Sequence, residues 1–251
     1  MYGVPLAVWG YMKGEKVIRA TICIVLAAAV GLPATAQASG SDEWEFVVTP
    51  YLWAAGMDGD VAVLGMPAEV DVSFGDILNA LDGGALIHFE GRKGQRAFFV
   101  DAVYLDLGED LDTPPGDVDL KQLTTEGGVM FGVAKQVQLL VGARYIDLEV
   151  DVDFAGPLGV SIGGDESWLD GFAGVAWTPE VGERWGVRLS GDLGAGGSDF
   201  TWQFRGTATY RKSDLISFPF GVRVMSIDYE DGGFAYDLTL SGLETGVGFH
   251  F

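Results

Sequence analysis

The sequence predicts an all-β protein: a single transmembrane antiparallel up-and-down β-barrel of about ten strands, preceded by a cleaved leader. Three observations support this fold class. The stretch 243–251 alternates apolar residues with small or polar ones, as a strand with one lipid-facing side does. No apolar run reaches the roughly 18 residues that a spanning helix needs, so a crossing would use a closed sheet. Short turns alternate with mostly longer loops, which is the connection pattern of outer-membrane barrels.

The first 38 residues predict a secretory signal peptide, which leaves 39–251 as the barrel domain. A positively charged segment that begins at Met12 precedes an apolar core at 21–30, and Ala36-Gln37-Ala38 supplies the small residues of a cleavage site. Met12 is also the better-placed start of such a leader. The expected location is therefore the outer membrane of a Gram-negative cell, reached by export.

Charge and cysteine content narrow the function further. The formal net charge is −21, which argues against nucleic-acid binding because such binding needs clustered Lys and Arg. Cys23 is the only cysteine and lies in the leader, so the mature chain has no thiol for disulfides, metal ligation or nucleophilic attack. We expect no cofactor.

Ten stretches with period-2 alternation are the expected strands: 44–54, 85–93, 97–107, 123–135, 137–150, 168–177, 185–193, 200–211, 215–228 and 243–251. Eight or twelve strands are alternatives, because the excursions at 59–73 and 230–240 can be counted in more than one way. A turn is expected at Asp58-Gly59-Asp60 and a helical turn at 75–81.

Aromatic residues gather at the expected strand ends, as the two interfacial girdles of a membrane barrel require. The inner-end group is Trp177, Trp185, Tyr210, Phe249 and Phe251, and the outer-end group is Tyr104, Tyr145, Phe200 and Trp202. The closing strand is expected to carry the signal for the barrel-assembly machinery on its outer face: Leu243, Val247, Phe249 and Phe251.

Charged residues at alternate strand positions predict a network inside the barrel, where an unpaired charge would be very costly. The expected members are Glu45, His88, Glu90, Asp101, Glu126, Arg144, Asp170, Arg188, Asp192, Arg205, Arg223 and Glu244. Such a network either plugs the barrel or lines a narrow passive path for a solute or ion. If it is a plug, removing Arg144 or Arg223 is expected to raise conductance.

The loops hold much of the acid, including Asp58, Asp60, Asp71, Asp76, Glu109, Asp110, Asp112, Asp117, Asp119, Asp151, Asp153, Asp165, Glu166, Glu230 and Asp231. This pattern fits a solvated, mutually repelling surface. It also fits divalent cations that bridge the loops to anionic lipid headgroups, although no complete EF-hand spacing occurs. Outer-membrane lipid and lipopolysaccharide are the expected surroundings.

An enzyme is not expected, because the chain lacks the Gly-x-Ser-x-Gly and His-Glu-x-x-His motifs. Only His88 and His250 could act as a general base, and His88 lies among the expected lumen carboxylates. A surface adhesion or interaction protein that acts through its acidic outer loops is the main alternative to a structural role or pore. An outer-membrane hydrolase is a further one.

Four segments in this order resemble a family of uncharacterised proteobacterial outer-membrane barrel proteins: 50–54 (Pro-Tyr-Leu-Trp-Ala), 75–78 (Gly-Asp-Ile-Leu), 142–145 (Gly-Ala-Arg-Tyr) and the ending from 240 to 251. More broadly, the chain is similar to small OmpA-like and opacity-protein-like barrels. The resemblance implies location and architecture and brings no activity or catalytic residue with it.

Overall fold

The computed structural model describes residues 43–63, 65–112, 115–154 and 160–251. The expected leader and the start at Met12 lie outside the described residues. The elements are β1 (Glu45–Val63), β2 (Met66–Val72), α1 (Phe74–Asn79), β3 (Leu81–Lys93), β4 (Arg96–Asp112), β5 (Pro115–Ala134), β6 (Val137–Phe154), β7 (Val160–Trp177), β8 (Trp185–Gly196), β9 (Phe200–Arg211), β10 (Ile216–Asp231), β11 (Phe234–Gly246) and β12 (Gly248–His250).

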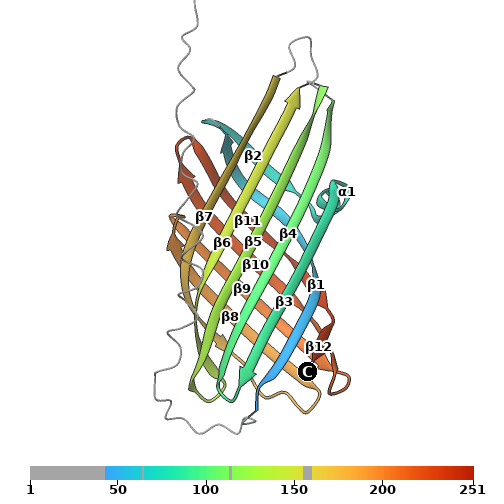
Figure 1. The fold of residues 1–251 in the computed structure, drawn as a ribbon, viewed down its shortest axis with the longest axis vertical. Coiled ribbons are helices and arrows are strands. Elements are labelled where there is room, and N and C mark those ends of the chain that lie inside the picture. Colours follow the sequence, from blue (N-terminus) through green and yellow to red (C-terminus); the bar gives the residue numbers. More distant parts are fainter. Residues whose placement is uncertain (1–42, 64, 113–114, 155–159) are drawn as a thin grey trace, which may run out of the picture. The chain divides into compact units, whose positions relative to one another are not determined.

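The strands close into an antiparallel barrel (Figure 1). From β3 to β11 each strand pairs with the next along the chain, and β1 pairs with both β3 and β11 to complete the ring. β12 continues the line of β11 between β1 and β10, and β2 lies beside the outer part of β1. The wall therefore contains the ten strands that the sequence predicts. We call the end with Glu45 and Phe251 the inner end and the opposite one the outer end.

The two faces of this wall carry different kinds of side chains, apolar outside and charged inside. Apolar side chains on the outside are well exposed, among them Leu52 (69%), Val141 (49%) and Leu243 (67%). Arg144 and Arg223 point inward with exposures of 0% and 1%. A soluble protein does not leave an apolar belt exposed around a charged interior, whereas lipid wets such a belt. The chain is thus an integral outer-membrane barrel.

The barrel wall is uneven in height. β8 and β9 contain 12 residues each, whereas β4 to β7 contain 17 to 20. The longer strands rise beyond the short β8–β9 turn, as the upper part of Figure 1 shows. The expected loops after 107 and 150 are therefore largely strand.

The expected turn at Asp58–Asp60 is wrong. These residues continue β1, where they pair with β2 on one edge and β11 on the other. Gly59 adopts a φ of 143°, which glycine tolerates and other residues rarely do. The excursion at 230–240 is likewise the outer part of β10 and β11, joined at Gly232 and Gly233.

Pro50 explains the break between β11 and β12. A proline has no N–H to donate to the ladder, so the strand facing it cannot continue its regular hydrogen bonding. The β11 ladder ends at Tyr51↔Gly246 and resumes at Val48↔Phe249, and the N–H of Val247 donates instead to the Pro50 carbonyl at 3.1 Å.

The helical turn expected at 75–81 is the short helix α1. Ser73 caps it: the Asp76 N–H donates to Ser73 Oγ, and the Ser73 N–H donates to the Asp76 carboxylate. Ile77 is its buried residue and packs with Met57 and Leu240. No helix among the described residues is long and apolar enough to cross a membrane.

The outer half of the lumen is packed with apolar and aromatic side chains, which we call the apolar layer: Ile146, Leu148, Trp168, Met225, Ile227, Tyr229, Tyr236 and Leu238. Trp168 and Tyr229 stack with ring centroids 4.0 Å apart. These residues come from β6, β7, β10 and β11, so they join opposite parts of the wall.

Candidate functional site

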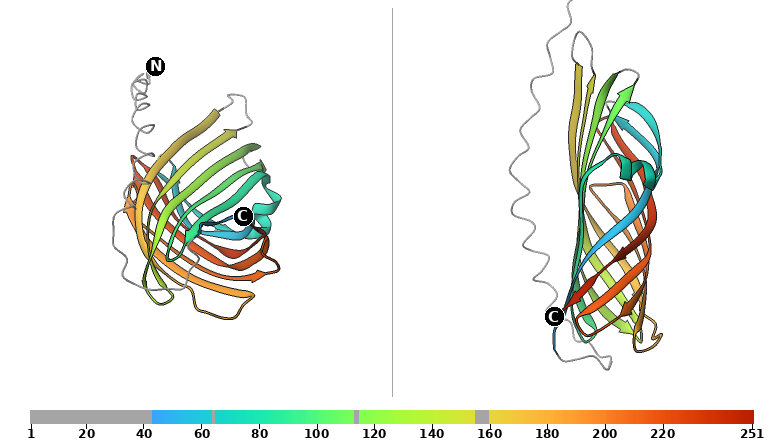
Figure 2. Two further views of the ribbon diagram at one scale, coloured as in Figure 1. Left: turned by 60° about the horizontal axis from the view of Figure 1, so that its bottom comes forward. Right: turned by 90° about the vertical axis from the view of Figure 1, so that its right-hand side faces the viewer.

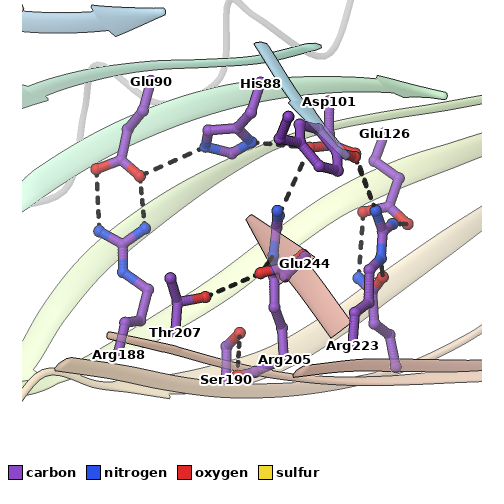
Figure 3. A network of polar contacts seen from close by, with 12 residues as sticks. His88, Glu90, Asp101, Glu126, Arg188, Ser190, Arg205, Thr207, Arg223 and Glu244 are labelled. Carbon is purple, nitrogen blue, oxygen red and sulfur yellow. Dashed lines mark hydrogen bonds and ion pairs between the residues drawn. The ribbon is translucent and has the colours of Figure 1, made fainter. Parts of the chain in front are cut away.

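A layer of paired charges crosses the lumen below the apolar layer (Figure 3). At one side Glu90 on β3 accepts two hydrogen bonds from Arg188 on β8, at 2.6 and 3.0 Å, and one from Arg92 at 2.7 Å. His88 lies beside it, with Nε2 3.8 Å from Glu90 and Nδ1 3.0 Å from Asp101. This histidine therefore links the Glu90 group to the centre of the layer.

Asp101 is the central carboxylate. It lies 3.2 Å from Arg223 and 3.5 Å from Arg205, and the Tyr51 hydroxyl donates to it at 2.8 Å. Arg205 also donates to Glu244 on β11 at 2.7 Å. Strands β1, β4, β9, β10 and β11 are joined at this point.

Arg144 organises the remaining part of the layer. Its guanidinium donates to Glu126 at 2.8 Å, to Asp192 at 2.9 Å and to the Thr201 hydroxyl at 2.9 Å. Arg223 also donates to Glu126, at 3.2 Å. Two guanidinium groups thus share one carboxylate.

Charge within the layer balances. It contains five carboxylates and five guanidinium groups: Glu90, Asp101, Glu126, Asp192 and Glu244, with Arg92, Arg144, Arg188, Arg205 and Arg223. Balanced pairing is what a low-dielectric interior demands, because each uncompensated ion would cost several kcal/mol. Arg223 also lies over the Trp53 ring, 4.7 Å from its centroid, at the boundary with the apolar residues.

The structure brings ten of the twelve expected lumen residues into this layer and places Asp170 and Glu45 elsewhere. Asp170 is fully buried, but its carboxylate accepts hydrogen bonds from the N–H and the hydroxyl of Ser198, both at 2.8 Å. It therefore fixes the β8–β9 turn. Glu45 is exposed at the inner rim of the barrel.

Sequence reasoning missed several members of the layer. Hydrogen bonds are contributed by Tyr51, Arg92, Thr201 and Gln203. The side chain of Gln203 makes three of them, to Arg223, Glu126 and Asp192. Their positions in the alternation of β1, β3 and β9 were the available signal. Tyr51, Thr201 and Gln203 carry no charge, so the cost of burying a charge does not single them out.

Below the charged layer a cavity of about 480 Å³ extends to the inner rim. Glu90, Arg188 and Arg205 line its inside, and Glu45 and His250 line its rim. Oε2 of Glu244, which also lines the cavity, is buried without a hydrogen-bond partner. The lumen thus has three levels from the inner end to the outer end: a cavity lined by both charged and apolar side chains, the charged layer and the apolar layer.

A serine–histidine pair lies at the rim of this cavity. Ser217 Oγ is 2.7 Å from His250 Nε2, while His250 Nδ1 is 3.3 Å from Nη2 of Arg211. Arg211 can only donate, so Nδ1 accepts and the ring proton is on Nε2. His250 then donates to the serine hydroxyl, which is the wrong direction for activating a nucleophile.

Among the described residues, no group of three or more Asp, Glu, His or Cys side chains is arranged to hold a metal ion. No known protein-family model matches the chain, and no curated protein matches it either.

The chain is similar to solved outer-membrane barrels. The outer-membrane protease OmpT of Escherichia coli aligns with a TM-score of 0.47 and 9% identity, over 87% of this chain and 100% of that one. The attachment invasion locus protein Ail of Yersinia pestis aligns with 0.41 and 12%, over 84% and 99%. Neisserial surface protein A aligns with 0.34 and 14%, over 85% and 100%. With TM-scores below 0.5, these matches add nothing to the barrel geometry described above.

Proposed function

We propose that this protein is a non-enzymatic outer-membrane barrel that is closed to solutes and serves a structural role. The proposal rests on one observation: two barriers follow one another along the same lumen. A solute entering from the inner cavity meets a charge-balanced layer of ion pairs and then a packed aromatic layer. Ions cross neither readily, because both would have to open together.

Planar-bilayer recording of the refolded protein tests this proposal. The wild type is expected to show no channel. The sequence alone predicted that removing Arg223 would raise conductance, but Trp168 and Tyr229 form a second layer above it. Arg223→Ala alone is therefore expected to show no channel either. The combined variant Arg223→Ala, Trp168→Ala, Tyr229→Ala removes side chains from both layers and is expected to conduct. Discrete openings in the wild type would instead support a narrow passive pore.

Fold integrity has to be checked alongside. The gel mobility of unheated samples distinguishes folded from unfolded barrel. If the triple variant does not conduct and migrates as unfolded protein, the double variant Arg223→Ala, Trp168→Ala is tested in its place. A folded double variant that also fails to conduct contradicts the two-barrier explanation.

A surface interaction role is the second candidate, and the uneven wall favours it. The extended outer parts of β4 to β7 carry directly opposed carboxylates, including Asp117↔Asp153, Asp119↔Asp151 and Glu149↔Asp165. Opposed like charges destabilise a sheet. A cationic partner that neutralises them would bind this extension, and binding that is lost in Asp117→Asn, Asp153→Asn tests for one.

A further inference from the structure

The barrel wall is split between β1 and β3. Their ladder runs from Glu45↔Arg92 to Pro50↔Ile87 and then stops. In the same register the next six residues of β1, 51–56, would face 81–86 of β3, but no pairing joins them. β1 next finds a partner on this edge at Met57, which pairs with Val72 of β2. We call this unpaired stretch the fork; six residues of strand extend about 20 Å.

Local sequence explains the fork. β3 shifts register between Leu81 and Gly83, and such a bulge bends a strand away from its regular path. β3 then follows β4, whereas β1 follows β2, and α1 bridges the two at the outer end. The right-hand view of Figure 2 shows β1 and β3 meeting at the inner end and diverging toward α1.

The fork opens within the lipid-facing belt. Leu52 and Ile87 point outward on its two sides, with exposures of 69% and 47%. Tyr104, beside Ala85 in the register, is an exposed aromatic residue that lies toward the outer interface. What meets the fork from outside is therefore the outer leaflet near its headgroups.

The fork leads to a small cavity inside the wall. The cavity has a volume of about 30 Å³ and is lined by Trp53, Met57, Ile77 and Leu86, among others. Nε1 of Trp53 is buried and has no hydrogen-bond acceptor. Gln122, Thr124 and Arg223 also line the cavity, which has room for about one water-sized group. The Trp53 N–H can therefore take one acceptor oxygen of a molecule that lies in the fork.

Two requirements identify the occupant. Unpaired strand edges present both N–H and C=O groups, and neither can remain unsatisfied in lipid. The molecule in the fork must therefore offer donors and acceptors at the depth where its acyl chains begin. Amide-linked, hydroxylated acyl chains supply both, whereas the glycerol esters of a phospholipid supply acceptors alone.

We propose that the fork between β1 and β3 is a lateral binding site for an N-acylated, hydroxylated glycolipid of the outer leaflet. Its amide and hydroxyl groups pair with the free edges at 51–56 and 81–86. Its acyl chains lie over Leu52 and Ile87. The inference rests on the wall geometry and not on whether the lumen conducts.

Photo-crosslinking tests this site. Leu86→Cys, which faces the cavity, is introduced in a Cys23→Ser background, labelled with a thiol-reactive diazirine in urea and refolded into vesicles that contain lipid A and phospholipid. Ile87→Cys is the positive control on the lipid-facing side, and Ile146→Cys is the inward control on a fully paired strand. Because lipid reaches an unpaired edge and not a closed wall, Leu86→Cys should crosslink lipid A at least about tenfold more than Ile146→Cys.

Each outcome of the crosslinking experiment either supports or overturns the proposal. A Leu86→Cys yield as low as that of Ile146→Cys overturns the proposal. Equal crosslinking of phospholipid and lipid A at Leu86→Cys shows unselective packing of lipid and overturns the glycolipid assignment. Selective capture of lipid A at Leu86→Cys supports it, and Ile87→Cys, over which the acyl chains lie, is expected to share that selectivity.

Hydrogen exchange of the unlabelled protein gives a second measurement. Every residue at 51–56 is paired with β11 on its other edge, so only the alternate amides of Tyr51, Trp53 and Ala55 face the fork. These amides should exchange in phospholipid vesicles and slow by about tenfold or more when lipid A is added, because its groups replace water at the free edge. The segment 222–227 of β10 is the matched control, since it is paired with both β9 and β11 and should not change. If the rate of amide exchange at 51–56 does not change when lipid A is added, the proposal is contradicted.

Discussion

Replacing Arg144 should destabilise the barrel more than almost any other single change. Its side chain is fully buried and is the only guanidinium within salt-bridge distance of Asp192 among the described residues. In Arg144→Met, Glu126 keeps Arg223, but Asp192 keeps only a 3.4 Å hydrogen bond from Gln203. Breaking a buried ion pair in this way costs about 3–5 kcal/mol.

Urea unfolding of the protein in lipid vesicles, followed by tryptophan fluorescence, measures this loss. Lys121→Met is the matched control, because its ion pair with Glu149 is 3.4 Å long and exposed on both sides. Such pairs contribute below about 1 kcal/mol. Methionine keeps most of the volume of the arginine stem, so the difference between the two variants reports mainly on charge.

A double variant separates the stranded charge from lost packing. Arg144→Met, Asp192→Asn removes the uncompensated carboxylate and should recover about 1–3 kcal/mol relative to Arg144→Met alone. If Arg144→Met costs less than about 1 kcal/mol, or if the double variant is no more stable than the single one, the account of a charge-balanced layer is wrong.

Two further perturbations address the wall and α1. A Cβ at Gly221 would overlap the carbonyl oxygen of Gly206 on the next strand, whereas one at Gly171 meets no atom within 4 Å. Gly221→Ala should therefore cost at least about 2 kcal/mol in the same urea assay and Gly171→Ala less than about 1 kcal/mol, and equal losses would contradict the close strand approach. At α1, hydrogen bonds from the Ser73 hydroxyl and N–H lower the pKa of Asp76 below its ordinary value. The ionised cap thus stabilises α1 above the ordinary carboxyl pKa and is lost as pH falls through the lowered one. Ser73→Ala should raise the pKa of Asp76 toward its ordinary value in an NMR titration, and an unchanged pKa would show that Ser73 is not the cause.

Alternation along the strands was enough to predict the barrel and most of its charged interior. A period of two places every second residue on one side, so Arg205 and Arg223 were assigned inward from the strand pattern alone. Acidic and basic residues at inward positions were informative because burying a charge is costly unless it pairs with an opposite charge. The inference used only local spacing and the sign of the charge.

Partner choice could not be predicted in the same way. Which carboxylate meets which guanidinium depends on strand register and tilt around a closed ring, and neither is encoded within one strand. Asp170 illustrates this limit, because it lies opposite Arg144 in the ladder yet binds Ser198. The turn wrongly placed at Asp58–Asp60 failed for a related reason: a glycine between two aspartates is typical of turns, but pairing on both edges kept these residues extended.

The charged layer also constrains how the protein reaches its native state. Tyr51 and Arg223 are separated by 172 positions along the chain, yet they share a hydrogen bond. Contacts of such long range form late, since the entropy of closing a large loop is lost before they can contribute. The ion pairs between early and late strands, such as Asp101–Arg223, therefore form only when distant parts of the wall come together. Ring closure and neutralisation of the interior become a single cooperative event, and an incompletely closed barrel would retain stranded charges that favour its reopening.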